Sequence, residues 1–134
     1  MEIEMVTGRI AQNLEHLKRF TSTPDAGCTR LPFTKETREA VDYLRKEMEE
    51  IGLEVKEDAA GNIYGILRGT DSSLPCVMTG SHIDSVLHGG NYDGIAGVVC
   101  SLEVARQIVE MGLEHRRDLV VIGFMDEEGM RFGT

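Results

Sequence analysis

The spacing of apolar residues predicts two amphipathic helices in the first part of the chain. The first covers residues 4–21. The second begins after Thr34, whose hydroxyl can cap a helix N-terminus, and ends at Gly52, a residue that suits a helix C-terminus. Both helices carry an apolar stripe at intervals of three or four residues, the pattern of a helix with one buried face. The stripes consist of Ile10, Leu14, Leu17 and Phe20 in the first helix, and of Val41, Leu44, Met48 and Ile51 in the second.

The residues after the second helix have the pattern of a β-hairpin. Residues 53–56 alternate between apolar and polar, as a half-buried strand does. Gly61 and Asn62 form a turn signal, and residues 63–67 return as the second arm.

The remaining pattern predicts a strand, a helix and a further strand. Residues 76–79 indicate a short buried strand, and a third helix follows a glycine-rich stretch, with its apolar stripe beginning at Ile95 and its end at Gly112. Residues 119–125 are continuously apolar, which is typical of a strand covered on both faces by helices. Parallel strands joined in this way cross over right-handedly. We therefore expect an α/β fold with a βαβ unit, a β-hairpin and helices packed on the sheet.

Candidate metal ligands follow both predicted parallel strands. His82 and Asp84 follow the first strand, Asp93 lies at the start of the connecting helix, and Glu127 and Glu128 follow the second strand. In open α/β sheets, bound molecules and ions lie beyond the carboxyl ends of the strands. These side chains should therefore meet at one rim of the sheet. Imidazole and carboxylate groups suit divalent metal ions.

This set of residues is suited to hydrolysis assisted by two metal ions. The two carboxylate oxygens of Asp93 can bridge ions about 3.5–4 Å apart, and Asp84 can accept the second ring N–H of His82. One of Glu127 and Glu128 can bind a metal while the other takes a proton from the attacking water. The pattern indicates cleavage of an amide-like bond.

Composition narrows the partners and the compartment. The net charge is −9, with 23 acidic against 14 basic residues, which argues against a nucleic-acid partner. The longest apolar stretch, residues 119–125, is too short to span a bilayer, so no membrane partner is expected. The N-terminal residues 1–4 lack the basic and apolar regions of a signal peptide, so a cytoplasmic protein is expected.

The cysteines indicate neither structural zinc nor a disulfide framework. Cys28, Cys76 and Cys100 are odd in number and widely spaced. Cys76 and Cys100 lie in apolar runs, and we expect both to be buried as small hydrophobic residues.

Three segments carry a resemblance to a known family. They read G-S-H-I-D-S-V at 80–86, G-G-N-Y-D-G at 89–94 and E-E-G-M-R-F at 127–132, and A-G-N-I-Y-G at 60–65 matches a hairpin turn. Together they resemble the amidase–hydantoinase–carbamoylase family. This family belongs to the superfamily of dinuclear-metal aminoacylases and carboxypeptidases.

The resemblance implies a role for each candidate residue. His82 would bind the first metal ion, Asp93 would bridge both ions, and Glu128 would bind the second. Glu127 would be the general base, and Asp84 would orient His82. The ions would be Zn²⁺ or Mn²⁺, with Co²⁺ and Ni²⁺ as alternatives. A non-proline cis peptide, here after Asp93, is also common in the superfamily.

The resemblance also implies a substrate and an assembly. Members hydrolyse N-carbamoyl-L-amino acids or allantoate, small molecules with a carbamoyl or ureido C–N bond, and the longer protein would form a homodimer. Family members are several-fold longer, so residues 1–134 would be the N-terminal portion of the catalytic domain, without the lid and dimerisation domain. Alone, this portion would lack metal ligands and activity.

Two alternatives remain open from the sequence. One is an aminoacylase or dipeptidase of the same superfamily. The other is a truncated, inactive module that associates with a partner through an open edge of its sheet.

Overall fold

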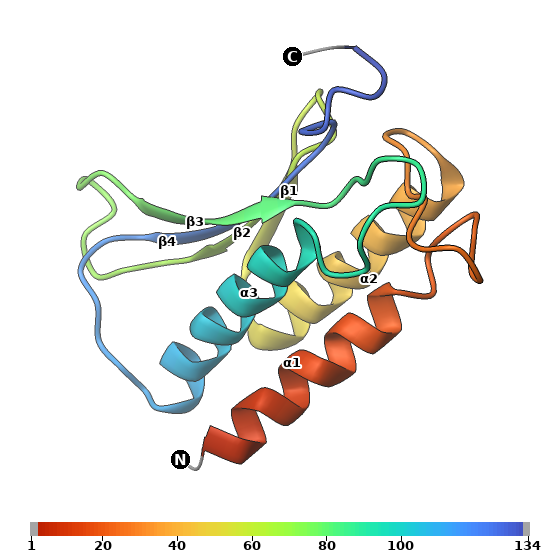
Figure 1. Cartoon of the computed structure of the whole chain (residues 1–134). Helices are drawn as coiled ribbons and strands as arrows, with labels where there is room; N and C mark the ends of the chain where they lie inside the picture. The colour runs from red at the N-terminus through yellow and green to blue at the C-terminus, as the bar shows by residue number, and fades with distance from the viewer. Residues whose placement is uncertain (1–2, 133–134) are drawn as a thin grey trace.

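Residues 3–132 are described by a computed structural model, in which three helices lie on one face of a four-stranded sheet (Figure 1). The N-terminal residues 1–4 are expected to carry no signal peptide, and two of them, Met1 and Glu2, lie outside the described residues. None of the helices in the described part is long and apolar enough to cross a membrane. The elements are α1 (Ile3–Leu17), α2 (Lys35–Ile51), β1 (Glu54–Glu57), β2 (Ile63–Leu67), β3 (Val77–His82), α3 (Ile95–Glu110) and β4 (Leu119–Phe124).

The sheet has the strand order β1-β2-β4-β3. β1 and β2 form the predicted antiparallel hairpin, and β2 pairs antiparallel with β4. β3 and β4 are parallel and are joined through α3, in a register that sets His82 opposite Phe124. The predicted hairpin and βαβ unit are therefore both confirmed. β3 runs on to His82, so this residue ends the strand instead of following it.

α2 has the predicted termini. The Thr34 hydroxyl accepts a hydrogen bond from the Thr37 backbone N–H at 3.4 Å, and Gly52 ends the helix with a φ of 94°. The apolar stripe of α2 is buried against the sheet and the neighbouring helices, as predicted: Val41, Leu44, Met48 and Ile51.

α1 ends four residues earlier than its apolar pattern predicts. The segment after Leu17 leaves the helix by tight turns, and Phe20 still packs against the core. The guanidinium group of Arg30 donates hydrogen bonds to the carbonyl groups of Leu17 and Phe20. These contacts satisfy the carbonyl groups at the helix end, so Phe20 contributes to the core from outside the helix.

The prediction that helices cover both faces of β4 is wrong. In the part of the chain that the structure describes, all three helices lie on one side of the sheet (Figure 1). On the open face, Val120 and Ile122 are shielded by their cross-strand neighbours, Ile66 and Tyr64, whereas Met78 on the edge strand β3 is 51% exposed. The apolar run of β4 thus reflects its central position between β2 and β3.

The prediction that Cys76 and Cys100 are buried is also wrong. Both side chains are exposed, and Cys28 is buried. Cys76 directly precedes the edge strand, and Cys100 lies on the face of α3 turned away from the core. An apolar run in an amphipathic helix or at a sheet edge therefore does not bury each of its members.

Candidate metal centre

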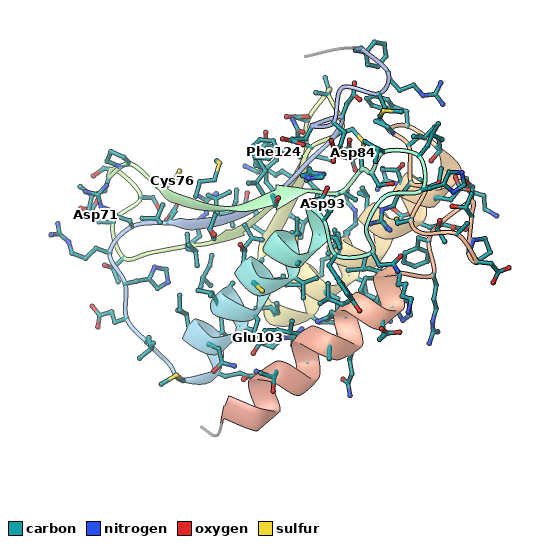
Figure 2. All side chains as sticks on the ribbon, viewed as in Figure 1. Asp71, Cys76, Asp84, Asp93, Glu103 and Phe124 are labelled. Atoms are coloured by element: carbon teal, nitrogen blue, oxygen red, sulfur yellow. The ribbon has the colours of Figure 1, made fainter. Side chains whose placement is uncertain are left out.

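Three predicted ligands converge at one end of the sheet. One ligand atom each from His82, Asp93 and Glu128 lies within 4.8 Å of the other two. Figure 2 shows Asp84 and Asp93 near Phe124, at the opposite end of the sheet from Asp71 and Cys76. The geometry thus agrees with the expectation that ligands after two parallel strands share a rim.

The ring of His82 has a defined orientation. Its Nδ1 lies 2.9 Å from the backbone carbonyl oxygen of Asp84. A carbonyl oxygen can only accept, so Nδ1 carries the proton and Nε2 keeps its lone pair for a metal ion. Nε2 lies 3.5 Å from Oε2 of Glu127, at the open side of the cluster.

Asp84 contacts the His82 ring by a different group than the sequence indicates. Its carboxylate Oδ1 lies 3.7 Å from His82 Nδ1, longer than a hydrogen bond. The fully buried carboxylate instead accepts the backbone N–H groups of Glu127 and Glu128, both at 3.2 Å. Asp84 therefore connects the His82 ring, through its carbonyl group, with the loop that carries both glutamates.

The loop after β4 is held by side chains whose role sequence reasoning missed. Asn62 Oδ1 accepts the backbone N–H of Met125 at 2.8 Å. The Asp126 carboxylate accepts the backbone N–H groups of Arg131 and Phe132 at 3.2 and 3.1 Å. A turn-forming aspartate three residues before Gly129 is a signal that was available for Asp126. The sequence pattern predicts a turn at Asn62 but does not predict its contact with Met125.

The residue after Asp93 has to be glycine. A Cβ atom on Gly94 would lie 2.4–2.5 Å from three atoms of the His82 ring, and its φ of 67° also favours glycine. This glycine lets the start of α3 approach the imidazole, and so brings Asp93 to the cluster. The expected cis peptide after Asp93 is not present, since the residues that the structure describes contain only trans peptide bonds.

The electrostatics of the cluster suit a cation. A hydrogen bond with the Asp93 carboxyl group and partial burial raise the pKa of Glu128, and the nearby His82 opposes this rise. Two carboxylates this close repel each other. A divalent ion between them would remove the repulsion, so the donor set fits the metal that the sequence implies.

The other histidines take no part in this cluster. His16 stacks on Tyr43 with ring centroids 4.2 Å apart, His88 bonds to the carbonyl group of Ala26, and His115 bonds to that of Arg117. Among the described residues, His82 is thus the one imidazole with the two carboxylates.

The mixed sheet with its His, Asp and Glu cluster at the ends of two parallel strands defines a metallopeptidase-like α/β protein. The profile of peptidase family M28 matches residues 62–134, more than half of the chain. The chain belongs to this family.

The chain is similar in sequence to proteins that are named amidohydrolases. The chain is 45% identical over 94% of its length to an N-carbamoyl-L-amino-acid amidohydrolase of Paenarthrobacter aurescens, of which it covers 30%. It is 38% identical over 95% of its length to an allantoate amidohydrolase of Bacillus subtilis, of which it covers 31%. The chain therefore spans about a third of the length of these relatives.

The solved structures agree with the fold. A hydantoinase/carbamoylase family amidase from Burkholderia ambifaria superposes with a TM-score of 0.90 at 32% identity, covering 95% of this chain and 31% of that one. The resemblance to the amidase–hydantoinase–carbamoylase family is confirmed by these similarities.

Proposed function

We propose that residues 1–134 form the N-terminal portion of the catalytic domain of a metal-dependent amidohydrolase. The reaction would be hydrolysis of the carbamoyl or ureido C–N bond of an N-carbamoyl-L-amino acid or of allantoate. The observation that carries the proposal is the convergence of His82, Asp93 and Glu128 within 4.8 Å. The names of the similar amidohydrolases support the substrate class.

Each residue of the site has a proposed task. His82 through Nε2, Asp93 through both oxygens and Glu128 would hold two divalent ions, Zn²⁺ or Mn²⁺ with Co²⁺ or Ni²⁺ as alternatives. Bound ions of this kind polarise a substrate carbonyl group and acidify water. The exposed Glu127 carboxylate would take the proton of the attacking water and deliver it to the leaving nitrogen.

Ammonia release tests the proposal in a longer protein that carries this segment. We expect release from N-carbamoyl-L-amino acids or allantoate, its loss after treatment with a chelator, and its return with Mn²⁺ or Zn²⁺. Acyl-amino acids and dipeptides in the same assay identify an aminoacylase or dipeptidase. No metal-dependent turnover of the carbamoyl and ureido substrates would contradict the proposed reaction.

A second candidate function is association through the sheet edge. β3 forms an edge of the sheet in the described part of the chain, and Val77 and Met78 on it are each 51% exposed. Unpaired edge strands are templates for pairing with another chain. Light scattering on the 134-residue chain should then give a dimer or larger species. A monomer over a wide concentration range would exclude pairing of this edge between copies.

A further inference from the structure

The connection between α1 and α2 runs along the loop that follows the ligand His82. Cys28 and Gly89 exchange two backbone hydrogen bonds of 2.9 and 2.8 Å. Arg30 and Ser85 are joined in both directions, because the Ser85 N–H donates to the Arg30 carbonyl group and the Arg30 N–H donates to the Ser85 hydroxyl. The path of the chain from β3 towards Asp93 is therefore set by this connection.

Arg30 lies at the centre of these contacts and is only 2% exposed. Its Nε donates to the carbonyl group of Ile83 at 2.8 Å, and its Nη1 donates to those of Leu17 and Phe20 at 3.0 and 3.1 Å. Ile83 stands between His82, whose ring is a candidate ligand, and Asp84. One guanidinium group thus joins the end of α1 to the backbone directly after β3.

Burial of an arginine costs free energy unless its contacts in the protein replace the hydrogen bonds that the guanidinium group made with water. Burial lowers the pKa of Arg30, and the negative charge of Asp84 opposes this change. The fully buried Asp84 carboxylate in turn holds the N–H groups of Glu127 and Glu128. The backbone that Arg30 holds at Ile83 is therefore followed directly by the carboxylate that holds the loop of both glutamates.

We propose that Arg30 is a positioning residue of the metal centre. It holds the Ile83 carbonyl group, and so sets the angle at which β3 presents the His82 ring and the Asp84 carboxylate. This inference rests on the proposed metal-dependent function. Lysine cannot replace it fully, because a single ammonium group lacks the planar fork that reaches carbonyl groups on two different elements.

Amide hydrogen exchange without metal tests the positioning directly. In Arg30→Met we expect faster exchange of the Glu127 and Glu128 amides by at least about tenfold, while the amide of Val121 in the centre of β4 keeps its protection. The matched control is Arg19→Met, the same change at an exposed arginine near the end of α1. Unchanged exchange at both glutamates would overturn the proposal.

Titration with Co²⁺ tests the consequence for metal binding, in the longer protein that carries this segment. Loss of a residue that orients a ligand typically lowers metal affinity by roughly 10–100-fold, and we expect a fall of this size in Arg30→Met together with a changed visible absorption spectrum of bound Co²⁺. Arg30→Lys should recover part of the affinity, because it keeps the charge.

A core variant separates positioning from general stability. Leu44→Ala removes a fully buried side chain of α2 and should lower thermal stability, with the Co²⁺ spectrum unchanged. If Leu44→Ala changes affinity and spectrum as Arg30→Met does, Arg30 has only a structural role. If the unaltered protein binds no Co²⁺, the metal centre itself is refuted, whereas normal binding in Arg30→Met refutes only the role of Arg30.

Discussion

Replacing Glu127 by glutamine is expected to lower turnover by about 10²–10⁴-fold in a longer protein that carries this segment, with both metal ions retained. The Glu127 side chain is 56% exposed, and its Oε2 lies 3.5 Å from His82 Nε2, on the side of the cluster where substrate and water would enter. An amide has nearly the same shape as the carboxylate but cannot accept a proton from water. The checks are kcat and metal content by elemental analysis.

The control for this variant is Glu114→Gln, which removes an exposed carboxylate in the connection between α3 and β4. It should leave kcat unchanged. Unaltered turnover in Glu127→Gln would show that another group is the base. Loss of metal in Glu127→Gln would instead show that Glu127 is a ligand. The proposed division of roles, with Glu128 as the ligand and Glu127 as the base, would then be wrong.

Asp93→Ala is expected to remove both metal ions, the second large effect. The Asp93 carboxylate lies in reach of the ligand atoms of His82 and Glu128, and it is hydrogen-bonded to Glu128. A ligand that bridges two ions, the role proposed for Asp93, would contribute to both sites, so its loss would weaken both. Elemental analysis after loading with Mn²⁺ or Zn²⁺ and desalting measures the result.

The matched control is Asp71→Ala, which removes an aspartate from the opposite end of the sheet (Figure 2). This variant should hold as much metal as the unaltered protein. Retention of one tightly bound ion in Asp93→Ala would contradict the bridging role and leave Asp93 as a ligand of a single site. Retention of both ions in Asp93→Ala would show that Asp93 is not a metal ligand.

Most of the fold could be predicted because its signals are local. The cap at Thr34 and the left-handed glycine at Gly52 act within one turn of α2, and their effect is visible in the sequence. The predictions failed where burial depends on distant elements. Cys100 is exposed because α3 is covered on one side only, a property of the packed helix that its own residues do not specify.

The candidate ligands could be predicted for a physical reason as well. Carboxyl ends of parallel strands meet at one edge, so the positions of His82 at the end of β3 and of Glu128 after β4 sufficed to bring them together. The side chains that hold the backbone next to these candidate ligands could not be predicted. Asn62 bonds to Met125 across 63 positions of the chain, and Arg30 bonds to Ile83 across 53.

The sequence by itself determined most of the elements, the order of the candidate ligands and their common rim, because these follow from periodicity, capping residues and strand direction. Only the tertiary structure decided which group of Asp84 faces the His82 ring. It also decided that a buried Arg30 bonds to the carbonyl group of Ile83, the residue between His82 and Asp84. Hydrogen-bond partners depend on distances of a few tenths of an ångström between segments far apart in the chain. Such distances exist only once the helices and the sheet have packed.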